Sequence, residues 1–314
     1  MPRVLRADCH ADTALWLLEQ PSLVELSGSH QDYRRISEYL DLAFLAIFLD
    51  EAEYEHELPR LFARLLLMLK ADIAAHADLV EPLLWREQLE QSGADLPKLL
   101  LLGAEGASCL GADCQHLETY FQAGLRFIGL TWNYANAYAG GCGGAGGLTE
   151  AGRRLVDLCN AKGLLLDGAH LNEASFWDLA ELRQYPFIVS HTCCAALQPH
   201  RRNLDDSQML ALAELDGVMG ITFVPDFLGA AGDLRRLCEH IEYAVALIGS
   251  CHVALGSDFD GCEPHAELSG VQTLPRVYTE LCRRGMNAAD VDNVMGNSVV
   301  RLLARVLPSR ARLD

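Results

Sequence analysis

Eight short apolar runs, separated by helix-like stretches, most restrict what this chain can fold into. Most of the runs are continuously apolar rather than alternating, which is typical of parallel strands buried on both faces. Eight strands that alternate with helices predict a closed (β/α)8 TIM-type barrel of the α/β class. An open, doubly wound parallel sheet is the competing arrangement. We expect the strands at 4–9, 42–49, 99–104, 125–131, 163–169, 187–191, 218–224 and 253–257.

The segments between the apolar runs have the patterns of amphipathic helices. The first of them is rich in Leu and Ala and carries Arg and Lys on its remaining face. Another begins after Thr149, a residue type that caps helix starts, and ends before Gly163. Because no Pro/Ser-rich linker and no internal repeat interrupts the pattern, we expect residues 1–314 to form one domain. The expected helices lie at 58–76, 149–163, 172–184, 205–217 and 233–249.

The charge balance and the cysteines limit the partners and the compartment. Asp and Glu number 43 against 25 Lys and Arg, so the net charge is −18. A surface this acidic repels nucleic acid and anionic membranes, and we expect neither as a partner. The start of the chain lacks the apolar run of a secretory signal, and every apolar stretch is too short to span a bilayer. Eleven scattered cysteines without a CxxC pair favour a reducing, cytoplasmic location.

Ionisable side chains follow five of the expected strands, at the ends where barrel enzymes carry their chemistry. Taken singly, each has an ordinary explanation: a hydrogen-bonded histidine, a helix-capping carboxylate or a turn aspartate. Taken together they are harder to explain, because burying several charges side by side is costly unless they bind a cation. These residues are His10 and Asp12 after the first strand, Glu105, His170, His191, and Asp258 after the last.

Three histidines and two carboxylates suit Zn²⁺, which takes imidazole nitrogen and carboxylate oxygen as ligands. Five ligands also allow two metal ions that share one carboxylate, and such a pair can trap a water and lower its pKa. Asp258 would take the proton from that water and pass it to the leaving group. The sequence therefore predicts a metal-dependent hydrolase.

The same motifs resemble those of the membrane (renal) dipeptidase family of zinc peptidases, within the amidohydrolase superfamily. The resemblance runs along nearly the whole chain, in the order and spacing typical of the family. It is carried by "DCHAD", "AEG", "GLTEAGRRLVDLCNAKGLLLDGAHLNEASF", "PFIVSHT", "HRRNLDD", "GSDFDG" and "GNSVVRLL".

This resemblance implies a (β/α)8 barrel with two zinc ions or another divalent metal. It implies that Arg202 binds the substrate's terminal carboxylate, a role that suits a guanidinium fork, and that Asp258 assists a metal-bridging hydroxide. The implied substrate is a dipeptide or a similar small amide, and family enzymes are often homodimers. The implied ligands are His10, Asp12 and Glu105 for one ion, and Glu105, His170 and His191 for the other.

Two positions depart from the family pattern. Trp132 stands where a histidine thought to contact the reacting carbonyl is usual, and Phe227 stands where a substrate-contacting tyrosine is usual. Both changes make the expected substrate pocket more apolar. They leave open two alternatives to a dipeptidase: an enzyme of the same superfamily acting on a non-dipeptide amide or lactone, and a metal-binding barrel without catalysis.

Overall fold

Nine parallel strands form one sheet in the computed structural model, which describes residues 5–54, 57–90, 96–182, 184–229 and 231–312. Their order is β1-β2-β4-β5-β6-β7-β8-β9, and β3 pairs only with β4, outside this path. The strands are β1 (Ala7–Asp8), β2 (Leu42–Phe48), β3 (Val80–Pro82), β4 (Lys98–Glu105), β5 (Leu125–Gly129), β6 (Leu165–Asp167), β7 (Ile188–Thr192), β8 (Val218–Ile221) and β9 (Val253–Leu255).

The first and last strands lie side by side and bring the eight-strand path round to its start. The Cys9 amide donates to the Leu255 carbonyl oxygen over 2.9 Å, and the Ser257 amide donates to Asp8 Oδ1 over 2.8 Å. The sequential order and this junction confirm the predicted (β/α)8 barrel and rule out the open, doubly wound sheet.

Every expected strand overlaps an observed one, but most observed strands are shorter. The run at 163–169 is paired only over Leu165–Asp167, because the backbone leaves the ladder to form the turn that carries His170. Residue 4, the expected start of the first strand, lies outside the described residues. The three-residue strand β3 was not predicted, because so short a run has no measurable periodicity.

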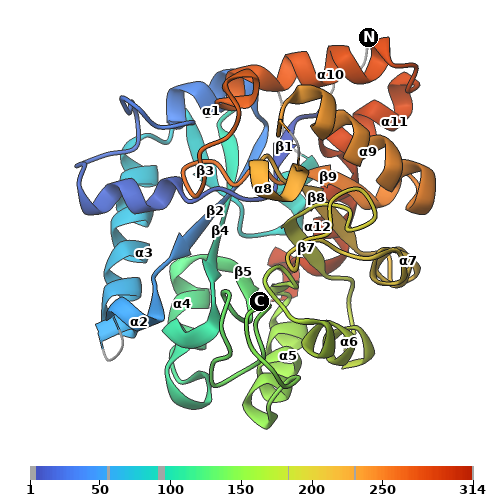
Figure 1. Ribbon diagram of the computed structural model, residues 1–314. Helices are drawn as coiled ribbons and strands as arrows, with labels where there is room; N and C mark the ends of the chain where they lie inside the picture. The colour runs from blue at the N-terminus through green and yellow to red at the C-terminus, as the bar shows by residue number, and fades with distance from the viewer. Residues whose placement is uncertain (1–4, 55–56, 91–95, 183, 230, 313–314) are drawn as a thin grey trace.

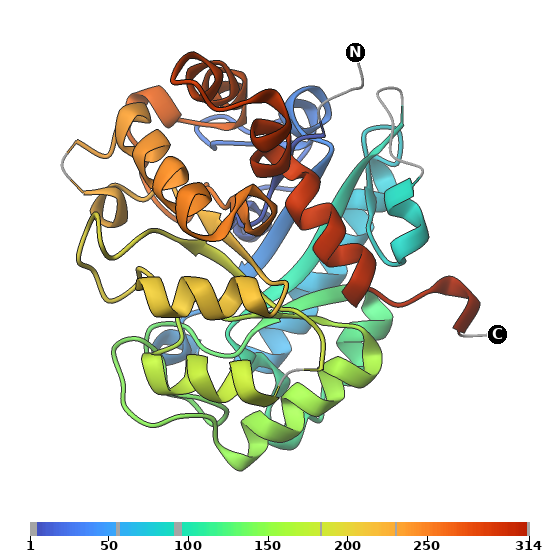
Figure 2. The same ribbon diagram turned by 90° about the vertical axis from the view of Figure 1, so that its right-hand side faces the viewer.

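Helices surround the strands on all sides, as the two views in Figures 1 and 2 show. The five predicted helices are all present, and Thr149 caps its helix by accepting a hydrogen bond from the Gly152 amide. Among the described helices, none is both long and apolar enough to cross a membrane. The helices are α1 (Tyr33–Tyr39), α2 (Glu51–Tyr54), α3 (Leu58–Ala75), α4 (Leu117–Ala123), α5 (Glu150–Lys162), α6 (Glu173–Leu182), α7 (Asp206–Glu214), α8 (Pro225–Leu228), α9 (Leu234–Ile248), α10 (Leu274–Arg283), α11 (Ala288–Asp292) and α12 (Ser298–Val306).

The core has two apolar layers. The larger one lies between the outward faces of the strands and the helices, and the smaller one fills the barrel together with α12. Inside the barrel, the rings of Phe44 and Phe127 are 5.2 Å apart. A Cβ at Gly103 would lie 2.2 Å from the Phe127 ring, so the close packing requires glycine there.

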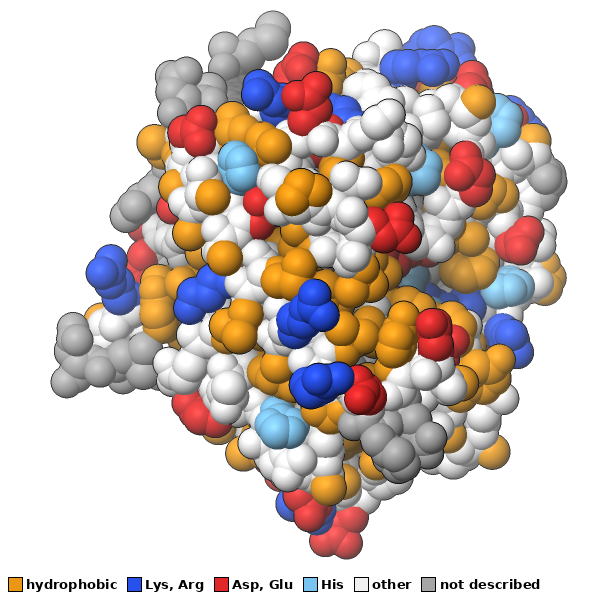
Figure 3. Space-filling model, turned by 90° about the vertical axis from the view of Figure 1, so that its left-hand side faces the viewer, with side chains coloured by type: hydrophobic (Ala, Val, Ile, Leu, Met, Phe, Trp, Pro, Cys, Tyr) orange, Lys and Arg blue, Asp and Glu red, His pale blue; other side chains and the backbone are white. Residues whose placement is uncertain are grey.

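The surface carries charges of both signs (Figure 3), and the cysteines form no disulfide among the described residues. On the face shown in Figure 3, Lys and Arg side chains are interspersed with acidic and uncharged ones. All eleven cysteines are free, and most of them are buried as small core residues.

Candidate metal centre

The predicted ligands meet at the carboxyl ends of the strands, around the side chain of Glu105. Glu105 is the last residue of β4, and its Oε2 lies 3.3 Å from His10 Nε2. Its other oxygen, Oε1, lies 2.7 Å from Nε2 of His170 and 3.7 Å from Nε2 of His191. His191 is part of β7, whereas His10 and His170 stand in the loops directly after β1 and β6. Four strands thus place one carboxylate among three imidazoles.

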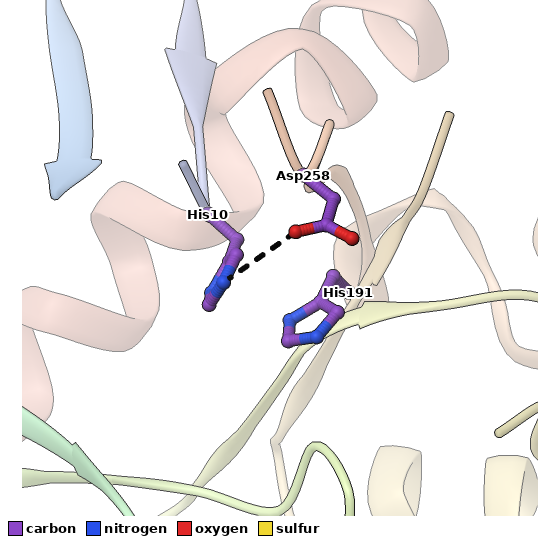
Figure 4. Close-up of side chains that lie close together, drawn as sticks. All are labelled: His10, His191 and Asp258. Atoms are coloured by element: carbon purple, nitrogen blue, oxygen red, sulfur yellow. Dashed lines mark ion pairs between the residues drawn. The ribbon is translucent and has the colours of Figure 1, made fainter. Parts of the chain in front are cut away.

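The ligand atoms form three overlapping groups whose members lie within 4.8 Å of one another. Two of these groups match the two predicted ligand sets. The third group was not predicted as a set: it joins Asp258 to two of the imidazoles, as Figure 4 shows. Asp258 Oδ1 lies 3.8 Å from His10 Nε2. The groups are His10, Asp12 and Glu105; Glu105, His170 and His191; and His10, His191 and Asp258.

Two of these residues have a backbone conformation that non-glycine residues rarely adopt. The φ angles of His170 and Asp258 are both 66°. The left-handed region costs a non-glycine residue roughly 1 kcal/mol or more, and such strain concentrates at functional sites. In each case the unusual turn follows the end of a strand and directs the side chain into the cluster.

The electrostatics of the cluster favour positive charge beside Glu105. Burial opposes ionisation of Glu105, but the charge of the neighbouring His10 and the close approach of the His10 and His170 rings hold its pKa well below the ordinary value. Burial lowers the pKa of His10, yet the Glu105 carboxylate outweighs it and raises that pKa to about 10. Asp12 has its pKa raised well above normal by burial and by the Glu105 charge. Two carboxylates this close are stable as anions only with a cation between them.

The donor set fits a divalent cation such as zinc. His10 Nε2 and Asp12 Oδ1 are buried and have no hydrogen-bond partner among the described residues. His170 Nε2 and His191 Nε2 face each other at 2.9 Å, beside the carboxylate. Imidazole nitrogens and carboxylate oxygens that converge in this way are the usual ligands of zinc.

The structure also brings the predicted catalytic and substrate residues to the cluster. Burial raises the pKa of Asp258 to about 7, although His10 opposes the rise. Arg202, 6% exposed, donates from Nη2 to the His191 carbonyl oxygen over 3.3 Å, and its Nε has no partner among the described residues. Its guanidinium lies 5.4 Å from the Phe227 ring. The Trp132 ring lies 6.1 Å from the His170 ring.

Two residues of the site were missed from the sequence. Asn133 Oδ1 lies 2.9 Å from His170 Nδ1, and Ser190 Oγ lies 2.9 Å from His191 Nδ1. The available signal was slight: Ser190 is the one polar residue in the apolar run before His191, and Asn133 merely follows Trp132.

Comparison with known proteins gives one family and several relatives. The sequence matches the family described as membrane dipeptidase, peptidase family M19, over residues 1–313. A Klebsiella pneumoniae protein described as uncharacterized, from the pqqA 5′ region, is 34% identical over 255 residues, which cover 77% of this chain and 94% of that protein. Dipeptidase aclJ of Aspergillus oryzae is 34% identical over 215 residues, 66% of this chain and 51% of its own length. The chain thus spans about half of that fungal relative.

Solved structures agree with the sequence comparison over almost the whole chain. The dipeptidase AC, a metallopeptidase of family M19, has a TM-score of 0.90 at 27% identity, covering 98% of this chain and 99% of its own. A metallopeptidase from Rhodobacter sphaeroides, solved with a phosphinate mimic of the dipeptide L-Ala-D-Ala, has a TM-score of 0.86 at 26% identity, covering 96% and 99%.

Proposed function

The chain belongs to the membrane dipeptidase family, peptidase family M19, and we propose that this metal-dependent hydrolase cleaves dipeptides or similarly small amides with two zinc ions. One observation carries the proposal. The Glu105 carboxylate lies among the Nε2 atoms of His10, His170 and His191, at 2.7 to 3.7 Å. We assign the ligands as in the two predicted sets: His10, Asp12 and Glu105, and Glu105, His170 and His191.

When bound, the zinc ions would supply Lewis acidity that polarises the scissile carbonyl group and acidifies a water molecule. Glu105 serves both ligand sets, so its negative charge would keep the two positions close together. The three imidazoles present Nε2 to this carboxylate, and the ligand set is built from buried side chains that solvent does not reach freely. Buried ligands whose rings make further hydrogen bonds are held in one orientation toward the metal.

Arg202 would bind the carboxylate of the substrate. Its guanidinium is buried and donates to the His191 carbonyl oxygen, and its Nε has no hydrogen-bond partner in the part of the chain that the structure describes. A buried guanidinium with an unused donor can form a charged hydrogen bond to an anionic ligand. Phe227 supports the group from one side, with its ring 5.4 Å from the guanidinium carbon. This position would orient a dipeptide by its free carboxylate.

Asp258 would transfer the proton. A carboxyl group whose pKa burial raises to about 7 can accept a proton from the attacking water and return it to the departing amine near neutral pH. Its place beside His10 and His191 puts it next to the ligand set without being a member of either predicted set. We therefore assign Asp258 as the general base and acid.

A panel of L,L and L,D dipeptides, with L-Ala-D-Ala among them, tests the proposal on protein reconstituted with zinc. We expect turnover of at least one member, its loss when a chelator removes the metal, and its recovery when zinc is returned. Asp258→Asn should lower kcat by about 10² to 10⁴-fold with unchanged zinc content. No turnover of any dipeptide by the zinc-loaded protein would contradict the proposal.

A second candidate is a hydrolase of a non-dipeptide amide or lactone. It is favoured by Trp132, whose ring packs 4.9 Å from the ring of Phe48 and forms an apolar wall near His170. Phe227 adds a second apolar surface beside Arg202. A lactone or amide turned over at least a thousandfold faster than any dipeptide would favour this candidate.

We further propose that residues 1–314 act as one hydrolase domain in the cytoplasm, where eleven free cysteines would remain reduced. A homodimer is a further prediction, which sedimentation of the zinc-loaded protein can test. The expected substrate is a small molecule, and neither nucleic acid nor a membrane is a proposed partner.

A further inference from the structure

In each of the three imidazoles of the metal centre, the Nδ1 atom hydrogen-bonds an uncharged side-chain oxygen. His170 Nδ1 lies 2.9 Å from Asn133 Oδ1. His191 Nδ1 lies 2.9 Å from Ser190 Oγ, and His10 Nδ1 lies 3.3 Å from the same oxygen. One serine hydroxyl therefore serves two imidazoles that come from opposite sides of the barrel closure, whereas the asparagine serves one.

The direction of these hydrogen bonds follows from the remaining partner of the serine. The Ser190 side chain lies close enough to the buried Asp167 carboxyl group to oppose the rise of its pKa, and this group accepts amide hydrogens from Ala169 and Ser190 over 2.9 and 3.0 Å. A carboxylate only accepts, so the single hydroxyl proton points to Asp167. The lone pairs of Ser190 Oγ then face the imidazoles, and both histidines must donate from Nδ1. The Asn133 side-chain oxygen also only accepts, so His170 must donate to it from Nδ1.

This arrangement places a proton on Nδ1 of each of the three imidazoles. Nε2 is then the ring atom left to bind a metal ion, and in His10 it must first release the proton that Glu105 favours in the metal-free protein. The Nε2 atoms of His170 and His191 are then two acceptors only 2.9 Å apart, next to a carboxylate oxygen 2.7 Å from the former. Such crowding of lone pairs is stable only around a cation, so the residues behind the rings prepare the cluster for metal.

Ser190 stands where the two predicted ligand sets meet. His10 belongs to the set with Asp12, and His191 belongs to the set with His170. The serine is fully buried, and it is the residue before His191 in β7. Asn133, half-buried in the loop after β5, lies against His170 of the second set, and its Oδ1 also accepts from the Cys142 thiol over 3.2 Å.

We propose that Ser190 is a positioning residue for both metal positions, whereas Asn133 positions a ligand of only one of them. The proposal rests on the proposed function, since it concerns the two ions assigned there. It predicts that the loss of one hydroxyl weakens two binding steps, and that the loss of one amide weakens a single step.

The test compares stepwise zinc affinities of the metal-stripped full chain and three variants, measured by competition with a chromophoric chelator. Ser190→Ala should weaken both steps by about 10 to 100-fold, and Asn133→Ala should weaken one step by a similar factor. Ser298→Ala is the matched control, because Ser298 is equally buried but donates to the Val253 carbonyl oxygen, away from the site. Its two zinc affinities should equal those of the wild type.

Nuclear magnetic resonance of the imidazole Nδ1–H groups gives a second readout. In the zinc-loaded protein, Ser190→Ala should shift or remove two of these resonances and Asn133→Ala one. If Ser190→Ala fails to fold, Ser190→Cys keeps the volume with a weaker acceptor and should give the same pattern.

Three results would overturn the proposal: a wild type that binds one zinc ion, a Ser190→Ala protein with only one weakened step, or wild-type imidazole resonances in that variant. Two weakened steps in a protein that hydrolyses no amide would support the positioning role while contradicting the proposed function. The two failures are therefore distinguishable.

Discussion

The two ends of the barrel are built from the same faces of the same strands, yet they differ completely in chemistry. Alternate residues of a strand share a face, so Leu99 and Leu101 of β4 point inward with Glu105. On β7 the inward Ile188 is followed two residues later by Ser190. The inward face thus changes from apolar to polar within two to four residues.

Because the two ends of each strand differ in this way, the residues that stabilise the fold are separate from those that bind metal. At the lower end of the barrel, where the strands begin, burial of apolar surface stabilises the fold and needs no ligand. At the upper end, where the strands finish, carboxylates are buried side by side, and a cation relieves the repulsion between them. Changes at the lower end should therefore act on the free energy of unfolding, and changes at the upper end on metal binding and turnover.

Glu105→Gln should give the largest effect, because Glu105 belongs to both predicted ligand sets. We expect kcat/KM to fall by at least about 1,000-fold, equal to about 4 kcal/mol, with loss of zinc at both positions. The free energy of unfolding of the zinc-free protein should change less, because the substitution removes both the attraction between Glu105 and His10 and the repulsion between Glu105 and Asp12. Zinc analysis, steady-state assays and urea unfolding measure the three quantities.

Glu81→Gln is the control for that experiment, since Glu81 lies in β3, outside the barrel path. It should leave zinc content and turnover unchanged. A Glu105→Gln protein that keeps both zinc ions and its activity would remove the distinction between the two ends.

Phe127→Ala tests the lower end. The Phe127 ring is 1% exposed and packs against Phe44 and over Gly103, so its removal leaves a cavity. We expect a loss of about 3 to 5 kcal/mol in the free energy of unfolding, measured with urea, and zinc affinity close to that of the wild type. The truncation Leu67→Ala, at a side chain 60% exposed, should cost less than about 1 kcal/mol. An equal loss in both variants would contradict the packing argument.

The sequence predicted the fold better than it predicted the site's surroundings. Continuous apolar runs identify buried parallel strands. Successive side chains of a strand point to opposite faces of the sheet, so all of them must be apolar when both faces are buried. The positions His10, Glu105 and His191 were identifiable because an ionisable residue after an apolar run is costly without a partner. Which ligands share an ion was implied only by the family resemblance, because from the residues alone it depends on the barrel closing Cys9 against Leu255.

Ser190 and Asn133, which hydrogen-bond the imidazoles, could not be predicted from the sequence for a different reason. Serine and asparagine are common in loops and at strand ends, so neither residue type signals a metal centre. Their role depends on distances of about 3 Å between atoms far apart in sequence, such as Ser190 Oγ and His10 Nδ1 at 3.3 Å.

His240 is a buried polar group outside both ends, and it sharpens the comparison because hydrogen bonds rather than a cation satisfy it. Its Nδ1 accepts from the Cys194 amide, and its Nε2 donates to the Leu228 carbonyl oxygen, both at 3.1 Å. Burial lowers its pKa from 6.5 to about 4. As the pH falls below 6.5, the unfolded chain takes up a proton that the native protein does not, so stability must fall.

At pH 5 this histidine should account for a loss of about 2 kcal/mol relative to pH 7.5. The measurement is urea unfolding of zinc-stripped wild type and of His240→Asn at both pH values. The variant keeps an acceptor for the Cys194 amide but cannot titrate, so its pH-dependent loss should be smaller by that amount. The same loss in both proteins would show that other groups cause it.

Phe227→Tyr should give the smallest effect, and it tests how finely the upper end is tuned for its substrate. The ring is half-buried between His200, at 4.6 Å, and the Arg202 guanidinium, at 5.4 Å. A hydroxyl there adds a polar contact beside the group that would bind the substrate carboxylate, so kcat/KM for dipeptides should rise by less than about tenfold. The free energy of unfolding should stay within about 0.5 kcal/mol, because the change is confined to the pocket. Phe48→Tyr, at a ring that packs 4.9 Å from Trp132 and has no described contact with Arg202, should leave kcat/KM unchanged. An equal gain in both variants would mean that pocket polarity in general, rather than the surroundings of Arg202, sets the preference for dipeptides.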